Sequence, residues 1–181
     1  MNARSRPDTS RRYSLAPAGR WGLVLWLWLP LLAAAGAVAY AAPHDRTWLH
    51  AGMLLAIAIA GSLAFLRRGI DLQGLELKVR STLFTKRVAV PSMRLDAARI
   101  VDLAERTDLK PGLKKMGFGY PGFYSDRYRT HGGQNAFCLI TDSRRVLAIP
   151  LHDGGWLLTS PERPRQLLQD LQQLAGTRRT P

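Results

Sequence analysis

The residues of this sequence that could most readily do chemistry are its histidines and its cysteine. There are four histidines and one cysteine, namely His44, His50, His131, His152 and Cys138. No two histidines stand at the spacing of metal ligands, and a single cysteine forms neither an intrachain disulfide nor a cysteine-based zinc site. Cys138 lies inside an apolar run, which indicates a core position. The sequence therefore predicts no metal site.

Known catalytic patterns are also missing. His152 and Asp153 are adjacent beside Gly154 and Gly155, and because neighbouring side chains point apart, the pair is typical of a solvated turn rather than a dyad. The sequence has no Gly-x-Ser-x-Gly motif. The glycine-rich stretch 105–134 lacks the Gly-Lys-Ser/Thr ending of a phosphate-binding loop, so its glycines indicate turns. We expect a non-enzymatic protein without catalytic residues or a cofactor.

Basic side chains are the best remaining indication of function. The 181 residues include 26 Lys and Arg against 13 Asp and Glu, a formal net charge of +13. Basic residues near an anionic leaflet are attracted to it, so they are candidates for binding a lipid headgroup or a partner, with a merely solvated basic surface as the alternative. The candidates are Arg67, Arg68, Lys78, Arg80, Lys86, Arg87, Lys114 and Lys115. No nucleic-acid-binding motif accompanies them, so we expect no nucleic-acid partner.

Two uncharged segments precede these basic residues in the sequence. Residues 21–42 and 48–66 contain no Lys, Arg, Asp or Glu, and each approaches the roughly 20 apolar residues that span a bilayer as a helix. Neither shows the polar face of a soluble helix. The loop 43–47 is too short to cross back, so the segments predict an antiparallel transmembrane hairpin over 21–66, with Pro30 kinking the first helix.

The flanks of this hairpin are basic. Five arginines lie within residues 1–20, and Arg67 and Arg68 follow the second segment. Because cytoplasmic flanks carry the excess of Lys and Arg, we expect both termini in the cytoplasm and the protein in a bacterial inner membrane. An alternative remains open, in which the sequence before Ala42 is a signal peptide with an Ala-x-Ala cleavage site at 39–41.

Small residues recur at four-residue spacing in both segments. They are Ala33, Ala37 and Ala41 in the first, and Gly52, Ala56 and Ala60 in the second. Such stripes allow close helix approach in lipid, so they fit packing within the hairpin or, equally, association with another membrane protein.

The rest of the chain predicts one strand-rich domain over 67–176, between an N-terminal segment 1–20 that we expect to be disordered and a tail 177–181. Alternation over 75–79 predicts a strand, and further strands are expected at 86–90, 99–103, 136–141, 145–149 and 156–159. Residues 105–134 are expected to be a loop with one short strand near 122–124. A C-terminal helix is expected from an N-cap at Ser160 to Gly176, with a stripe of leucines facing a small barrel.

Several of these passages resemble the bacterial PH-like (pleckstrin-homology-like) domains that follow membrane hairpins. The matching passages are 75–79, 88–91 before Ile100, 117–124, 137–141 and 160–162, and the likeness covers roughly residues 70–175. The resemblance implies a membrane-anchored α+β protein in which a PH-like small β-barrel is capped by a C-terminal α-helix. It also implies a membrane-associated role without agreed catalytic residues.

These observations favour a non-enzymatic inner-membrane protein that presents a cytoplasmic PH-like domain to a protein or to anionic lipid. The alternative is a structural accessory subunit of a larger envelope or transporter complex, assembled through its transmembrane helices.

Overall fold

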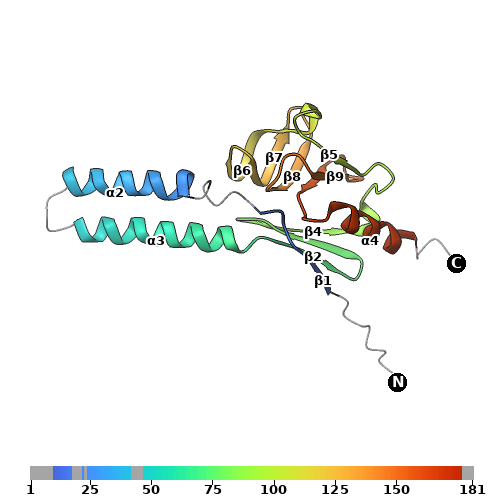
Figure 1. The fold of residues 1–181 in the computed structure, drawn as a ribbon, viewed down its shortest axis with the longest axis horizontal. Helices are drawn as coiled ribbons and strands as arrows, with labels where there is room; N and C mark the ends of the chain where they lie inside the picture. Colours follow the sequence, from blue (N-terminus) through green and yellow to red (C-terminus); the bar gives the residue numbers. More distant parts are fainter. Residues whose placement is uncertain (1–9, 18–21, 23, 42–46, 177–181) are drawn as a thin grey trace, which may run out of the picture. The chain divides into compact units, whose positions relative to one another are not determined.

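The computed structural model describes residues 10–17, 22, 24–41 and 47–176. The chain divides into two compact units, one made of Met1–Pro17 with Arg68–Pro181 and one made of Ala18–Arg67. We call their described parts the β domain and the helical unit. The helical unit therefore interrupts the β domain in the sequence, and the chain enters and leaves it from the same domain (Figure 1).

The helical unit contains a π-helical turn η1 (Val24–Trp28) followed by α2 (Leu29–Ala41), and then α3 (Thr47–Leu66). The sequence predicts one helix over 21–42 with a kink at Pro30, and the described part of this segment is helical over Val24–Ala41, with the change from π-helical to α-helical pattern directly before Pro30. Proline has no N–H to donate at an interior helical position, which fits a change of hydrogen-bond pattern at this point. Trp21 and the loop residues 43–46 lie outside the described residues.

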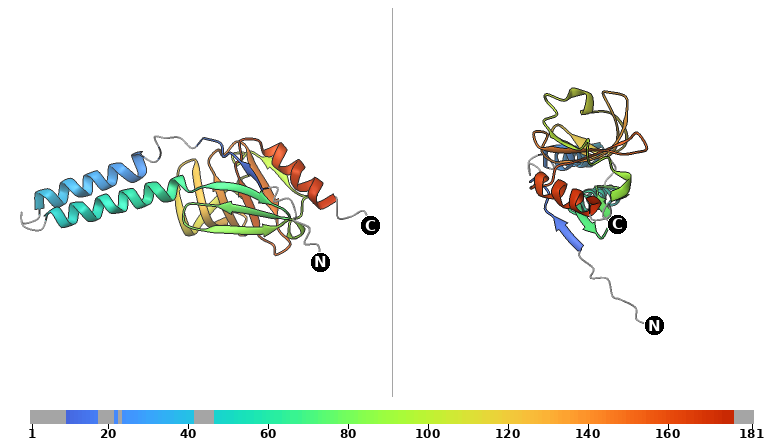
Figure 2. Two further views of the ribbon diagram at one scale, coloured as in Figure 1. Left: turned by 90° about the horizontal axis from the view of Figure 1, so that it is seen from below. Right: turned by 90° about the vertical axis from the view of Figure 1, so that its right-hand side faces the viewer.

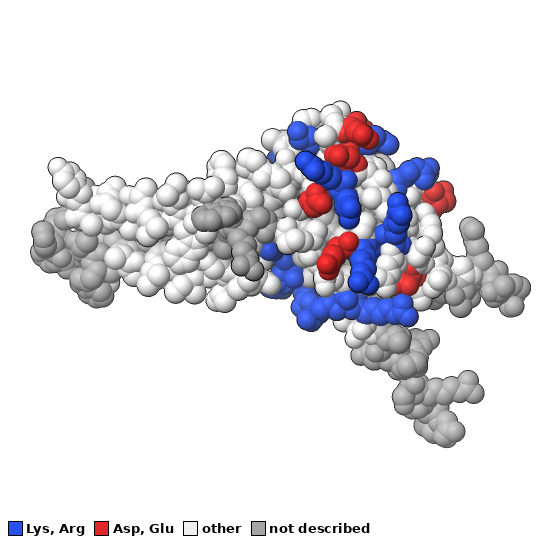
Figure 3. All heavy atoms as spheres, in the orientation of Figure 1, with Lys and Arg blue, Asp and Glu red and all other residues white. Residues whose placement is uncertain are grey.

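One described helix is long and apolar enough to cross a membrane, through Leu49–Leu66 of α3. The apolar stretch Val24–Tyr40 is shorter. Large apolar side chains are exposed along both helices, and α2 and α3 contain no Lys, Arg, Asp or Glu, so their described residues are white in Figure 3.

The two helices pack through other residues than the small-residue stripes. A Cβ atom on Gly61 would lie 3.1 Å from Leu27 Cδ2, and Ala58 is buried. The stripe residues Ala33, Ala37, Gly52, Ala56 and Ala60 are exposed, and the side chain of Ala41 is not described. The expectation that the stripes close the hairpin is therefore wrong, because a large leucine on one helix fits against a glycine on the other.

The β domain has two sheets, and its elements are bounded as follows. The four-stranded sheet has the order β1-β2-β3-β4, with β1 (Ser10–Tyr13), β2 (Gly69–Gln73), β3 (Glu76–Arg80) and β4 (Thr85–Ala89). The six-stranded sheet has the order β5-β9-β10-β8-β7-β6, with β5 (Arg99–Val101), β6 (Pro111–Tyr120), β7 (Phe123–Thr130), β8 (Asn135–Ile140), β9 (Val146–Pro150) and β10 (Trp156–Thr159). Short 3-10 turns η3 (Val90–Ser92) and η4 (Thr107–Leu109) and the helix α4 (Pro164–Gly176) complete it. In Figures 1 and 2, α4 lies at the end of the sheets away from β6.

The strand pattern read from the sequence is largely confirmed. In β3, Leu77 and Val79 are buried while Lys78 and Arg80 remain partly exposed, as alternation requires. Strand β9 is apolar throughout, and β8 is apolar after Asn135, because the six-stranded sheet is covered on both faces. One core cluster joins its Phe137 face to the four-stranded sheet and α4, and a second lies on its Cys138 face under residues 103–109. The β-sheet domain with a C-terminal helix is present as expected, with its hydrogen bonding divided between two sheets.

Disorder throughout residues 1–20 is not what the structure shows for residues 10–17. Strand β1 pairs antiparallel with β2, from Ser10 opposite Gln73 to Tyr13 opposite Ile70. Tyr13 is buried and its hydroxyl donates to Asp170 of α4. The four residues of β1 are only Ser, Arg and Tyr and carry little local signal, and the edge of β2 supplies their backbone partners.

The stretch expected as a loop contains the longest strand. Strands β6 and β7 form a hairpin within residues 105–134, closed by a turn at Gly122 with φ +84°. Its glycines serve close packing rather than loop flexibility: a Cβ on Gly119 would collide with the Tyr128 hydroxyl, and one on Gly117 with the backbone of Ser125. Glycine was therefore a misleading loop signal here.

The C-terminal helix begins later than expected. Helix α4 starts at Pro164, because Ser160 is buried and its hydroxyl donates to the Asp142 carbonyl at 2.8 Å instead of capping the helix. The leucine stripe is confirmed, since Leu167 and Leu171 are fully buried against the first core cluster.

Candidate anion-binding groove

A groove of about 520 Å³ runs between the edge of the four-stranded sheet and the β6–β8 part of the other sheet. Strand β4 forms one wall, and β6, β7, β8 and the turn before β10 form the other. We call it the basic groove; it is lined by Thr85, Lys86, Arg87, Lys115, Arg127, Tyr128, Asn135, Ala136, Phe137, Asp153, Gly154 and Gly155. Four of these side chains are cationic and one is a carboxylate.

Strand β4 brings two of the sequence-predicted residues into the groove. Lys86 and Arg87 are neighbours, so their side chains leave opposite faces of the strand. Because β4 is the edge strand of its sheet, a groove along that edge is reached from both faces. Lys86 is half-buried and Arg87 is exposed.

Strand β6 contributes the third predicted residue through an irregularity. The register of the β6–β7 pair shifts between Lys114 and Met116, which leaves Lys115 as an extra residue without a partner on β7. Its ammonium group donates to Asn135 Oδ1 at 2.7 Å, which directs the side chain into the groove. Lys114 pairs with Tyr128 in register and does not line the groove.

Sequence reasoning missed the fourth cation, Arg127 on β7. Its guanidinium lies 5.2 Å from the centroid of the Phe84 ring, a cation–π distance. The alternation of Asp126, Arg127, Tyr128 and Arg129 between buried and exposed is a strand signal that could have placed Arg127 on an outward face. It was missed because the surrounding glycines indicated a loop.

Two further side chains of the groove walls, Tyr128 and Asp153, are polar and already hydrogen-bonded. Burial raises the pKa of Tyr128 to about 12, so its phenol stays a neutral donor, and it donates to the Phe118 carbonyl at 3.3 Å. Asp153 accepts the Gly155 N–H at 2.8 Å, which confirms the turn expected there.

The charge balance of the groove suits an anion. None of the acidic side chains in the described part of the chain forms an ion pair with Lys86, Arg87 or Arg127. Cations left without a carboxylate are able to form charge-assisted hydrogen bonds to phosphate or carboxylate oxygens. The four cations on the walls are therefore groups that can bind an anion.

The remaining predicted residues lie elsewhere. Arg80 forms an ion pair with Asp71 at 2.7 Å, and the Arg68 guanidinium lies 4.9 Å from the centroid of the Phe123 ring. Lys78 is on the outer face of β3, opposite Arg87 in register. Arg67 belongs to the helical unit. The structure thus brings together Lys86, Arg87 and Lys115 of the eight candidates.

A second basic hollow, of about 460 Å³, lies beside β1 and the start of α4 and is lined by Arg11, Arg12, Tyr13, Ser14, Glu162, Arg163 and Gln166. Two of its three arginines have carboxylate partners. Arg11 contacts Asp170 at 3.1 Å and Arg12 contacts Asp71 at 3.2 Å. We call this the β1–α4 seam, and its ion pairs join the N-terminal strand to the rest of the domain.

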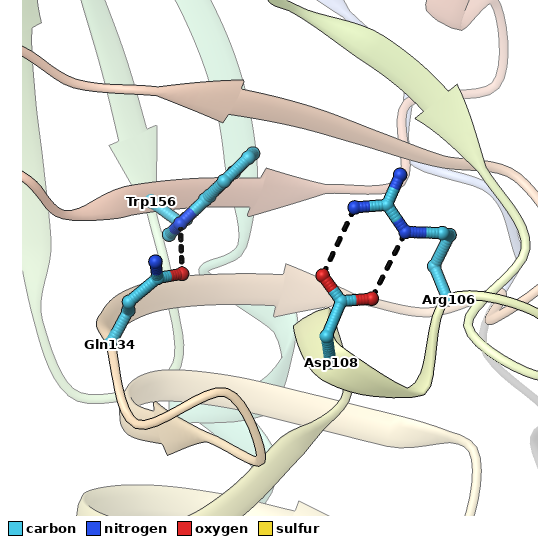
Figure 4. Close-up of polar contacts among 4 residues, drawn as sticks. All are labelled: Arg106, Asp108, Gln134 and Trp156. Carbon is cyan, nitrogen blue, oxygen red and sulfur yellow. Dashed lines mark hydrogen bonds and ion pairs between the residues drawn. The ribbon is translucent and has the colours of Figure 1, made fainter.

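Two other polar side-chain pairs lie outside the basic groove and join parts of the fold to one another. Figure 4 shows Arg106 donating two hydrogen bonds of 3.0 Å to the Asp108 carboxylate, and Trp156 Nε1 donating to Gln134 Oε1 at 2.6 Å. The described residues contain no group of three or more His, Cys, Asp or Glu that could hold a metal ion.

Comparison with known proteins gives one match. A family model described as a bacterial PH domain matches residues 73–175, which includes every strand from β3 to β10 and nearly all of α4. Neither a curated protein nor a solved structure matches the chain.

Proposed function

Since this chain belongs to the bacterial PH domain family, we propose that it is a non-enzymatic, membrane-anchored binding module whose basic groove holds an anionic group. The ligand is an anionic lipid headgroup or an acidic segment of a partner protein. The observation that carries the proposal is the grouping of four cations, Lys86, Arg87, Lys115 and Arg127, in one groove with a single carboxylate.

The connectivity of the β domain supports a membrane hairpin. Strand β1 precedes the helical unit and β2 follows it, and the two strands are hydrogen-bonded neighbours. A chain that leaves a domain and returns to it crosses a bilayer an even number of times. If α3 crosses, the segment between β1 and α3 crosses as well, although α2 alone is short for a span.

The basic flanks then favour a bacterial inner membrane with the β domain and both termini in the cytoplasm. A direct test is extraction of membranes at alkaline pH and high salt. An anchored chain stays in the membrane fraction, whereas full-length chain that is soluble without detergent contradicts the anchor.

The ligand is tested on full-length chain in neutral detergent. Titration with water-soluble dihexanoyl phosphatidylglycerol is compared with dihexanoyl phosphatidylcholine, and a polyglutamate peptide is the acidic-protein probe. Binding of either anionic probe that is weakened by Lys86→Gln and absent for phosphatidylcholine supports the proposal. Equal binding of the two lipids together with no peptide binding overturns it.

A second candidate function is a structural accessory subunit assembled through its helices. The exposure of Ala33, Ala37, Gly52, Ala56 and Ala60 favours it, because small residues facing lipid permit close approach by another helix. Replacing Ala56 and Ala60 with leucine is expected to abolish co-purification of such a complex. Unchanged assembly counts against this candidate.

A further inference from the structure

One end of the β domain is fixed close to the last residue of α3. Helix α3 ends at Leu66 and β2 begins at Gly69, so Arg68 lies within about 7 Å of the helix end by chain length alone. The Arg68 guanidinium stacks on the ring of Phe123, the first residue of β7. The tip of the β6–β7 hairpin therefore lies beside Arg68, the first residue of the β domain after the helical unit.

This hairpin tip is aromatic. The Tyr120 and Phe123 rings are stacked with centroids 5.0 Å apart, and the Phe118 ring lies 6.2 Å from the centroid of each. Phe118 and Tyr120 are half-buried, so part of each ring stays accessible. Aromatic rings of this kind prefer the boundary between headgroups and acyl chains of a bilayer.

A second element projects at the same end. Arg80, the last residue of β3, pairs with Gly69, the first residue of β2, so the turn over 81–84 continues past the start of β2. Leu83 at this turn is 52% exposed. It is one of the few large apolar side chains exposed on the described β domain.

A buried carboxylate holds this turn in place. Asp126 on β7 is fully buried and accepts the backbone N–H groups of Leu83 and Phe84 at 3.3 and 2.9 Å, and the Ser81 hydroxyl. It is the one non-glycine residue of the described chain with positive φ, at +84°, and it faces Gly117, where a Cβ would collide with it. A buried carboxylate on a strained backbone is unfavourable by itself. Here its hydrogen bonds hold the turn over 81–84 in one conformation, in which Leu83 is exposed.

We infer that this end of the β domain is a membrane-contact surface, in which Leu83 and the Phe118–Tyr120 hairpin tip enter the interface of the bilayer that α3 crosses. The inference rests on the proposed membrane anchor. The occupant is lipid because Arg68, which stacks on Phe123 at this end, follows the last residue of α3 by only two positions in the chain.

The test uses full-length chain reconstituted in phosphatidylcholine–phosphatidylglycerol vesicles, with an environment-sensitive fluorophore on Leu83→Cys. Cys138 does not compete for the label, since it is fully buried and burial raises the pKa of its thiol. The matched control is Leu113→Cys, a leucine that is 68% exposed on β6 and about 20 Å along the strand from the hairpin tip. Ile57→Cys in the middle of α3 reports the anchor itself.

Each label is quenched from the lipid by spin-labelled lipids and from water by iodide. The expected result is strong lipid quenching at positions 57 and 83, with several-fold weaker iodide quenching at 83 than at 113. Lipid quenching at 57 with iodide quenching at 83 equal to that at 113 overturns the inference and leaves the anchor standing.

Two other outcomes also overturn it. A label at 83 shielded from both quenchers shows that protein covers the turn. A label at 57 that spin-labelled lipids do not reach contradicts the anchor as well, so the two failures are distinguishable.

Discussion

Two clusters of basic side chains lie on the same β domain and differ in what they face. In the β1–α4 seam, Arg11 and Arg12 contact Asp170 and Asp71. In the basic groove, four cations share one wall carboxylate, Asp153, which is bonded to its own turn. The difference teaches that a cation with a carboxylate partner holds the fold, whereas a cation without one remains available to a ligand.

The largest effect is expected from neutralising two groove cations, in the variant Lys86→Gln/Arg87→Gln. Each cation near an anionic surface contributes about 1 kcal/mol, so the variant should bind dihexanoyl phosphatidylglycerol roughly 30-fold more weakly. Its thermal unfolding midpoint should be unchanged, because neither side chain has an ion-pair partner among the described residues. Titration of full-length chain in detergent measures the lipid affinity, and thermal unfolding measures the midpoint. Unchanged affinity would show that the unpaired cations of the groove do not bind the lipid.

The opposite result is expected in the seam. Asp170→Ala removes the acceptor of the buried Tyr13 hydroxyl and the partner of Arg11. Loss of one hydrogen-bond partner leaves a buried polar group unsatisfied, so the free energy of unfolding should fall by about 1–2 kcal/mol with no change in lipid affinity. The matched control is Asp108→Ala, which removes an exposed carboxylate that lies outside both the seam and the groove. A seam variant that lost lipid binding while keeping its stability would contradict the division of roles.

Two adjacent lysines on β6 sharpen the comparison. Lys115 enters the groove through the irregularity in the strand, and Lys114 does not. We expect Lys115→Gln to weaken binding of dihexanoyl phosphatidylglycerol about fivefold, equivalent to about 1 kcal/mol, and Lys114→Gln to leave it unchanged. Equal losses for the two variants would show that overall surface charge, not the groove, attracts the lipid.

The smallest effect is expected at the exposed pair Arg106–Asp108. Hydrogen bonds from Arg106 hold the pKa of Asp108 below its usual range. A carboxyl group whose pKa is lowered by folding stabilises the fold above its unfolded pKa and loses that contribution as pH falls through the folded value. Because the pair is solvent-exposed, Asp108→Asn should shift the thermal unfolding midpoint only slightly at pH 7, and the difference should disappear once the pH has fallen below the lowered pKa of Asp108. A large shift at pH 7 would show that exposed pairs also hold this fold.

Much of the fold could be predicted because it depends on local patterns. Alternation in β3, the continuous apolar runs of β8 and β9, and the leucine stripe of α4 are signals that a sequence carries by itself. The β6–β7 hairpin could not be predicted in the same way. Gly117 and Gly119 are set by contacts with Ser125 and Tyr128 across the hairpin, and such contacts exist only once the two strands pair.

The residues of the basic groove were predicted only in part, because a sequence shows which residues are basic but not which of them meet. Lys86, Arg87 and Lys115 were candidates because basic residues are visible in any sequence, and they do meet in one groove. Arg80 was equally basic, but its approach to Asp71 at 2.7 Å removes it from the candidates. Arg127 entered the groove from a segment whose strand had not been expected.

The sequence alone determined the uncharged segments, the basic excess, most strands and the resemblance to PH-like domains, because composition and short-range periodicity record them. The tertiary structure decided which cations are paired, how β1 joins the sheet although the helical unit separates it from β2 in the sequence, and how Asp126 holds the turn that carries Leu83. Those features depend on residues far apart in the chain, such as Tyr13 with Asp170 and Leu83 with Asp126, and folding alone brings them together.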